Sequence, residues 1–216
     1  MIVYGSSMSP YVRKVLAFGA EKGIDLESRP IGLGSDDPEF RQASPFGKIP
    51  AFRDGDFTIS DSSAIVAYLE AIRPDPALIP VDARARARTI WYDEFADTII
   101  GACGNKMFFN RIVAPRFLKR EGDLSMAEKA ECEELPPLLD YLQGVIPETG
   151  FLVEDRLTLA DLAVASPFAN FRHLGLVWDL TRHGKVKAYV EAILARPSFK
   201  HWVDREAAFL ARASAA

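Results

Sequence analysis

The chain has 216 residues, of which 49% are apolar and 26% are charged, so wholesale disorder is excluded. Its net charge of −4 is a poor match for nucleic acid or an anionic membrane surface, and no apolar run reaches the ~18–20 residues that a membrane span needs. Two cysteines are too few for a disulfide framework, and no secretory signal is visible at the N-terminus. We therefore expect a soluble cytoplasmic protein.

The first third of the chain alternates short strand and helix patterns. Apolar runs and an Asp-Gly turn predict strands over residues 1–5, 26–31, 49–52 and 57–59. Helical spacing and glycine stops predict helices over residues 12–22, 36–43 and 64–72. The predicted order is βαβαββα, an α/β unit.

Strand patterns end at a proline-punctuated segment near Pro74 and Pro76, after which only helical spacing remains. We divide the chain into an α/β domain over residues 1–75, a linker over 76–84 and an all-α helical domain over 85–216. Helices are predicted over residues 83–120, 125–145, 159–173, 185–195 and 198–213. The first either runs unbroken or breaks near 101–104 or at Pro115, and the second is expected to kink at Pro136.

The turn between the first strand and the first helix carries serines at positions 6, 7 and 9. Serine caps helices well and proline favours the first helical position, so Ser9-Pro10 predicts the helix start. Ser9 either only caps its own helix or presents its hydroxyl to an anion at the positive helix end.

A thiolate is one anion that such a hydroxyl would stabilise. A thiol of pKa ~8.5 becomes mostly ionised at pH 7 when its pKa falls by ~2 units, which requires ~2.7 kcal/mol. A charge-assisted hydrogen bond supplies about 1.5–3 kcal/mol and the helix end another ~0.3–1 kcal/mol. The motif therefore needs neither a metal nor a general base, and the scattered histidines show no metal-ligand spacing.

A second motif, Lys48-Ile49-Pro50, precedes the third strand. The Ile49–Pro50 bond is trans by default, whereas a cis bond would turn the Ile49 backbone outward as an edge for an extended peptide. Lys48 is either simply solvated or meets a carboxylate.

The third motif, Asp61-Ser62, opens the last helix of the α/β domain. By itself it predicts an N-cap cluster. In a binding site, Ser62 offers a hydroxyl and an N–H to a carboxylate while Asp61 accepts from an ammonium. That combination suits the zwitterionic head of an amino acid.

Together, Ser9-Pro10, Ile49-Pro50 and Asp61-Ser62 in a βαβαββα unit followed by helices resemble the cytosolic glutathione transferase family. The resemblance covers nearly the whole chain and points to a serine-type bacterial member of the zeta, theta or tau-like kind. It implies a thioredoxin-like glutathione-binding domain joined to an all-helical domain. It also implies glutathione as co-substrate, no metal, usually a homodimer, and a role in detoxification.

The resemblance assigns the catalytic hydroxyl to Ser9, with Ser6 as second choice, because the register against Arg13 favours Ser9. A serine cannot form the mixed disulfide of thiol–disulfide exchange, so conjugation, addition or isomerisation is expected instead. Cys103 and Cys132 lie in the helical half and are expected to be core or surface residues rather than nucleophiles.

The same resemblance implies the contacts with the rest of glutathione. Ile49 and a cis Pro50 match the backbone clamp on the cysteinyl residue, and Lys48 lies near the glycyl carboxylate. Asp61 and Ser62 match the γ-glutamyl site, where many members carry Glu-Ser, so Asp61 is a conservative departure.

The electrophile site is less clearly marked. An apolar cleft between the domains is expected, with candidate lining residues Met8, Tyr11, Phe108, Phe109 and Arg111, although a Phe-Phe pair is also typical of a core.

A further motif in the helical half is structural. Thr158 and Asp161 have the spacing of a capping box. This box resembles the buried capping box of this family's helix six. We therefore expect the two residues to stabilise the fold and not to act on substrate.

We therefore expect a glutathione transferase that conjugates the glutathione thiolate to a small hydrophobic electrophile. One alternative is a glutathione-dependent isomerase similar to maleylacetoacetate isomerase. The other is a non-catalytic carrier or protein-interaction module. Such a protein is expected to have lost the hydroxyl or the Asp-Ser pair, and both are present here. Neither nucleic acid nor a membrane is expected as a partner.

Overall fold

The N-terminal part of the chain forms a mixed four-stranded sheet in a computed structural model that describes residues 1–32 and 34–213. The strands are β1 (Ile2–Tyr4), β2 (Glu27–Arg29), β3 (Ala51–Asp54) and β4 (Phe57–Ser60), in the spatial order β2-β1-β3-β4. β1 pairs parallel with β2 and antiparallel with β3, and β3 and β4 form the predicted hairpin. The thioredoxin-like order βαβαββα predicted from the sequence is confirmed.

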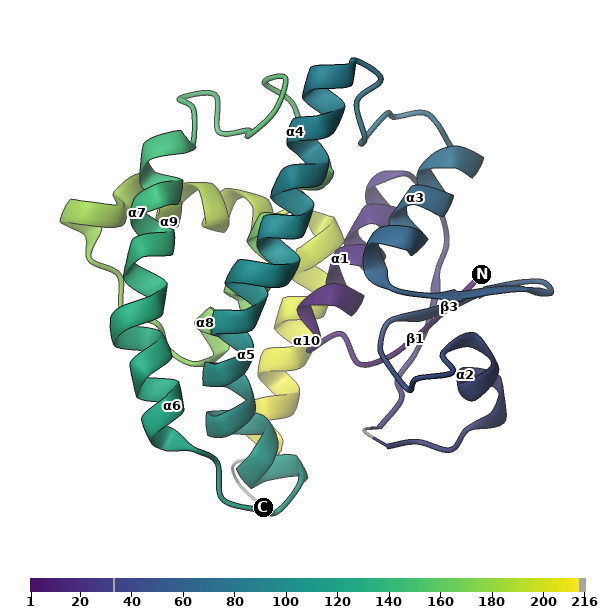
Figure 1. Cartoon of the computed structure of the whole chain (residues 1–216), viewed down its shortest axis with the longest axis horizontal. Coiled ribbons are helices and arrows are strands. Elements are labelled where there is room, and N and C mark those ends of the chain that lie inside the picture. Colours follow the sequence, from purple (N-terminus) through teal and green to yellow (C-terminus); the bar gives the residue numbers. More distant parts are fainter. Residues whose placement is uncertain (33, 214–216) are drawn as a thin grey trace.

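Three helices complete this unit: α1 (Pro10–Glu21), α2 (Pro38–Ala43) and α3 (Ser62–Ile72). Figure 1 shows α1 between the sheet and the helical part of the molecule, and α1 contacts both α3 and α8. Because it is covered on both sides, α1 buries even Arg13 and Lys14. Charged side chains inside a protein need polar partners, so the partners of these two residues shape the site described below.

The rest of the described chain is helical, and the all-helical prediction is confirmed. Its segments are α4 (Ala83–Glu94), η1 (Phe95–Ile100), α5 (Gly101–Phe108), η2 (Phe109–Phe117), α6 (Leu124–Lys129), η3 (Ala130–Glu134), α7 (Leu135–Val145), α8 (Leu159–His173), α9 (Leu180–Leu194) and α10 (Pro197–Ala213). Within the described residues, no helix has both the length and the apolar content needed to cross a bilayer.

The long helix after residue 83 is unbroken, which is one of the two possibilities that the sequence left open. It continues from α4 through α5 to Phe117, with wider π-helical turns at η1 and η2 and with Pro115 inside η2. Two glycines of this helix allow neighbouring helices to approach it closely. A Cβ at Gly101 would lie 2.8 Å from the Tyr11 hydroxyl, and a Cβ at Gly104 would lie 3.2 Å from the Phe171 ring. Gly101 and Gly104 therefore let α1 and α8 pack against this helix.

Two other helices are locally irregular. The stretch from α6 to α7 contains the π-helical segment η3 immediately before Pro136, and such a widened turn accommodates a residue that lacks an N–H. α9 kinks at His183, whose backbone is not helical (φ −126°, ψ 26°). A short helical segment capped by Asp179 therefore precedes the main helix, which starts close to the predicted residue 185.

The central helix α8 is buried along its length, and its start is fixed by the capping residues. Asp161 accepts hydrogen bonds from Thr158 N (2.9 Å), Leu152 N (2.9 Å) and the Tyr189 hydroxyl (3.1 Å). Both Thr158 and Asp161 are fully buried. The box therefore joins α8, α9 and the preceding loop in the core of the helical domain.

Candidate active site

Ser9 stands at the N-cap of α1, but its hydroxyl does not cap the helix. Its backbone is extended (φ −73°, ψ 125°), and the side chain makes no capping hydrogen bond. The turn is held by the main chain, because Ser9 N donates to Ser6 O and Arg13 N donates to Ser9 O, both at 3.0 Å. The hydroxyl remains available to a ligand at the positive end of α1.

The neighbouring serines have partners within the chain. Ser6 Oγ accepts from Met8 N at 3.4 Å. The hydroxyl of Ser7 donates to the carboxylate of Glu206 and helps to lower its pKa. Among the three serines of this turn, Ser9 is thus the one whose hydroxyl makes no hydrogen bond to a described residue.

The helical domain anchors this turn through buried polar groups. Arg13 donates to Glu206 (3.1 and 2.8 Å), to Ser166 O (2.6 Å) and to Asn170 Oδ1 (2.9 Å). Asn170 in turn donates to Met8 O at 3.0 Å. Besides its own main-chain hydrogen bonds, the serine turn is therefore anchored by residues more than 150 positions away in the sequence.

Glu206 is the common acceptor of this group. It pairs with Arg13 and with His173, whose Nε2 lies 2.9 Å from Oε2, and its side chain is only 2% exposed. Burial by itself raises the pKa of Glu206, but the charge of Arg13 and the hydrogen bonds from His173, Arg13 and Ser7 outweigh it and lower the pKa.

The second motif lies at the turn before β3, with Ile49 half-buried and Pro50 buried. The Ile49–Pro50 bond is cis, and Pro50 O accepts from Asp61 N at 3.3 Å, which joins the second motif to the third. Ser44 Oγ donates to Lys48 O at 2.7 Å and fixes the turn before it. The side chain of Lys48 is exposed.

Asp61 holds an uncommon backbone conformation at the start of α3. Its φ of 91° lies in the left-handed region, which costs a non-glycine residue about 1–3 kcal/mol. In return its carboxylate accepts from Ser63 N (2.9 Å) and Ala64 N (3.0 Å). Such strain concentrates at functional sites, and here it places Asp61 beside the cis-proline turn.

A buried ion cluster lies directly behind Ser62. Lys14 Nζ is 2.6 Å from Asp93 Oδ1 and 2.6 Å from Asp97 Oδ2. Ser62 Oγ donates to Asp97 at 3.0 Å, and Ser63 Oγ donates to Asp93 at 2.8 Å. The cluster thus connects α1, α3 and the long helix at the domain boundary.

This cluster carries one ammonium and two carboxylates. Burial disfavours the charged form of Lys14, but the two aspartates outweigh burial and raise the pKa of Lys14. Burial raises the pKa of Asp97, and the nearby charge of Asp93 adds to the effect, although Lys14 opposes it. One ammonium therefore faces two carboxylates behind Ser62.

The candidate electrophile residues do not all meet. Met8 packs against Phe108 together with Ile112 and Leu210. The Tyr11 hydroxyl donates to Asp97 O at 3.1 Å and accepts from Asn105 Nδ2 at 3.2 Å.

Phe109 and Arg111 are turned to other partners. The guanidinium of Arg120 lies 5.4 Å from the Phe109 ring centroid, and Arg111 pairs with Glu131 at 2.6 Å. Neither residue belongs to the cluster of Met8 and Phe108.

The two cysteines differ in environment. Cys103 is buried and donates to Ala130 O, and burial, with the charge of Glu134, raises its pKa to about 11. Its thiol is therefore protonated at neutral pH, which makes it a poor nucleophile. Cys132 is exposed on the helical domain.

The sequence did not reveal Lys14, Asp93, Asp97 or Glu206 as parts of this region. Lys14 bonds residues 79 and 83 positions away, and Arg13 bonds one 193 positions away. The one local sign in the sequence was that two charged residues, Arg13 and Lys14, fall among the apolar residues of α1.

The architecture, a thioredoxin-like domain with a mixed four-stranded sheet followed by an all-helical domain, is the glutathione S-transferase fold. Models of the glutathione S-transferase N-terminal and C-terminal domains match residues 3–77 and 108–206. Glutathione S-transferase 3 of Zea mays is 32% identical over 210 residues, which cover 93% of this chain and 92% of the maize protein. The chain belongs to the glutathione S-transferase family.

Two further comparisons extend this result. Maleylacetoacetate isomerase of Rattus norvegicus is 29% identical over 202 residues, covering 91% of this chain and 88% of the rat protein. A crystal structure of a glutathione S-transferase from Rhodospirillum rubrum F11 matches with a TM-score of 0.84 at 25% identity, over 93% of this chain and 90% of that one. Both similarities span the two domains.

Proposed function

We propose that the protein binds glutathione in its N-terminal domain and conjugates it to a small hydrophobic electrophile. The observation that carries this proposal is the Ser9 hydroxyl, which occupies the N-cap of α1 without capping it. A thiol placed there would accept a hydrogen bond from Ser9 in its ionised form and would face the positive end of the helix. The resulting thiolate is the nucleophile, and no metal takes part.

The remaining motifs supply binding. In this proposal the main chain of Ile49 pairs with the cysteinyl residue of glutathione, and Lys48 reaches the glycyl carboxylate. The γ-glutamyl carboxylate accepts from the Ser62 N–H and from the Ser62 hydroxyl, which turns from Asp97 to the ligand, and Asp61 accepts from the γ-glutamyl ammonium.

The electrophile would lie between the domains, beside Met8 and Phe108. These two side chains belong to one apolar cluster. The Tyr11 hydroxyl nearby on α1 accepts a hydrogen bond from Asn105 of α5. Phe109 and Arg111 contact other partners, which makes them weaker candidates for this pocket.

The binding half of the proposal is tested by calorimetric titration with glutathione. We expect Ser62→Ala to raise the dissociation constant about 5- to 20-fold, less than the effect of a full hydrogen bond to a charged group, because the hydroxyl exchanges Asp97 for the ligand. Turnover at saturating glutathione should change little, because Ser62 lies at the end of the tripeptide away from the thiol. Ser125→Ala on the exposed face of α6 is the matched control. Unchanged affinity in Ser62→Ala would remove this residue from the site.

Isomerisation is the second candidate function, and the similarity to the rat maleylacetoacetate isomerase favours it. The same thiolate would add to a cis double bond and leave again after rotation, so glutathione would not be consumed. An assay with a cis-diketo acid, with glutathione measured before and after, separates the two functions. Loss of glutathione in step with product supports conjugation, and its recovery supports isomerisation.

We further propose that the protein acts as a cytoplasmic homodimer. Large apolar side chains stand in water on the monomer, among them Phe46 (87% exposed) and Trp91 (45% exposed), and a second copy would cover such groups. Light scattering at micromolar concentration tests this, and a mass of about one chain (23.9 kDa) would contradict it.

A further inference from the structure

Two side chains of α8 hold the main-chain carbonyls of the residues before and after Ser9. Asn170 Nδ2 donates to Met8 O at 3.0 Å. Ser166 Oγ donates to Pro10 O at 2.7 Å. Ser166 and Asn170 lie one turn apart on α8 and are only 1% and 4% exposed. Two buried hydrogen bonds from a helix of the other domain therefore flank the candidate catalytic serine.

The side-chain amide of Asn170 is held in the orientation that this contact requires. Its Oδ1 accepts from Arg13 Nη2 at 2.9 Å, which leaves its Nδ2 for Met8 O. Arg13 is fixed in turn by Glu206 at 2.8 Å and by the main-chain oxygen of Ser166 at 2.6 Å. Turning the amide over would oppose oxygen to oxygen and N–H to N–H. Asn170 therefore presents a fixed donor to the serine turn.

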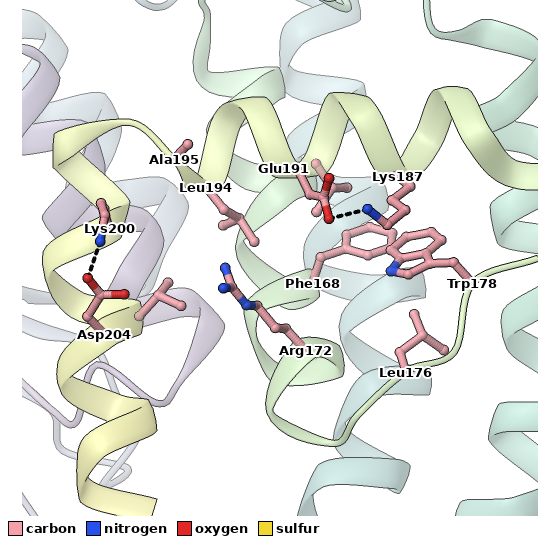
Figure 2. Close-up of a pocket in the computed structure, with 12 residues that line it drawn as sticks. Phe168, Arg172, Leu176, Trp178, Lys187, Glu191, Leu194, Ala195, Lys200 and Asp204 are labelled. Carbon is pink, nitrogen blue, oxygen red and sulfur yellow. Dashed lines mark hydrogen bonds and ion pairs between the residues drawn. The ribbon is translucent and has the colours of Figure 1, made fainter. Parts of the chain in front are cut away.

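The face of α8 that holds the serine turn is distinct from the face that packs near α9. Because an α-helix has about 3.6 residues per turn, positions 168 and 172 lie on the side away from positions 166 and 170. Figure 2 shows Phe168 and Arg172 beside a cavity of about 440 Å³ that α8 forms with α9 and α10. Arg172 is exposed and therefore offers a matched control on the same helix.

The position of the Ser9 hydroxyl depends on the main chain that carries it, because the hydroxyl itself is not tied down by capping α1. The hydrogen bonds within the turn, from Ser9 N to Ser6 O and from Arg13 N to Ser9 O, fix its local shape. The bonds from α8 add fixed directions for the carbonyls on both sides of Ser9. This matters because hydrogen bonds weaken steeply with poor alignment, and a displacement of about 1 Å in a catalytic group can lower a rate about 100-fold.

We propose that Asn170 and Ser166 are positioning residues for the ionisation of the glutathione thiol. By holding Met8 O and Pro10 O, they keep the Ser9 hydroxyl directed at the sulfur. This inference rests on the proposed role of Ser9 as donor to the thiolate. Neither positioning side chain touches glutathione, because both are buried between α8 and α1. The helical domain thus takes part in ionising a thiol that the N-terminal domain binds.

Asn170→Asp tests the contact with Met8. Aspartate has nearly the shape of asparagine and still accepts from Arg13, but it opposes an oxygen to Met8 O. We expect the pKa of the bound glutathione thiol, followed by ultraviolet absorbance, to rise by about 0.5–1 unit. At pH 6, where most of the bound thiol is protonated, kcat should then fall about 3- to 10-fold, and at pH 9 the loss should largely vanish. The dissociation constant of glutathione at pH 6 should change less than about twofold.

Ser166→Ala tests the second contact without adding a charge. It removes the hydroxyl that donates to Pro10 O and keeps the main-chain oxygen that accepts from Arg13. The pKa of the bound thiol should rise here too, and kcat at pH 6 should fall about two- to fivefold. Arg172→Gln, on the other face of α8, is the matched control and should titrate and turn over as the parent does.

The same two substitutions in a Ser9→Ala background show whether α8 acts through Ser9. We expect no further rise in the pKa of the bound thiol there, because the hydroxyl that they position is gone. A rise of the same size without the hydroxyl would overturn the proposal, since it would reveal a direct effect such as the added charge. A thiol pKa that depends on Ser9 but changes in neither α8 variant would also overturn it and would leave the proposed function intact. A Ser9→Ala protein whose bound thiol titrates as in the parent would instead contradict the proposed function, and this inference with it.

Discussion

Replacing Ser9 by alanine is expected to lower kcat for conjugation with a dinitrophenyl halide about 10- to 150-fold. This range corresponds to the loss of one charge-assisted hydrogen bond, about 1.5–3 kcal/mol, from the thiolate. The affinity for glutathione should change little, because the neutral thiol gains much less from the hydroxyl than the thiolate does. Steady-state kinetics with glutathione varied at fixed electrophile measures both quantities.

Two further variants make this result specific. Ser9→Thr keeps a hydroxyl and should retain more turnover than Ser9→Ala. Ser6→Ala should leave kcat nearly unchanged, because Ser6 Oγ accepts from Met8 N and does not stand at the helix start. Equal turnover in Ser9→Ala and the parent would exclude Ser9 from the reaction, and a large loss in Ser6→Ala would transfer the role to Ser6.

Replacing Glu206 by alanine is expected to lower the free energy of unfolding by about 3–5 kcal/mol. The change leaves the guanidinium of Arg13 buried without its carboxylate, and His173 and Ser7 lose the same partner. Urea denaturation followed by circular dichroism measures the loss. Glu128→Ala on the exposed surface of α6 is the control and should change stability by less than about 0.5 kcal/mol.

The pH dependence of stability provides a second test of Glu206. Its pKa in the folded protein lies below the ordinary value, so the folded state binds a proton less readily than the unfolded chain does. The stabilisation is fully present above the unfolded pKa of about 4.3 and is lost as the pH falls through the folded pKa. The difference between the parent and Glu206→Ala should therefore be larger at pH 7 than at pH 3. A difference independent of pH would contradict the ion-pair explanation.

The local motifs were readable from the sequence because their physics is local. Ser9-Pro10 marks a helix start by capping preference and proline geometry, and the Asp-Gly turn marks the hairpin of β3 and β4. Asp61 was placed correctly at the start of α3, and the structure added its positive φ, which no pattern in one sequence reveals.

The contacts between the domains were not readable. Arg13 and Lys14 interrupt an apolar helix, and the sequence gives no sign of which distant carboxylates they meet. For Gly101 and Gly104 the sequence leaves open whether the helix breaks there, and in the structure they allow α1 and α8 to approach the long helix. Periodicity describes one helix at a time, but the choice between a break and a close contact depends on what packs against it.

The most direct measurement is the ultraviolet absorbance of the thiolate of bound glutathione as the pH is varied. If Ser9 and the start of α1 stabilise the thiolate, the pKa of the bound thiol should lie about 1–2 units below that of the free thiol. In Ser9→Ala most of that shift should disappear while glutathione still binds. A bound thiol that titrates at the same pH as free glutathione would contradict the proposed mechanism, even in a protein that binds the tripeptide well.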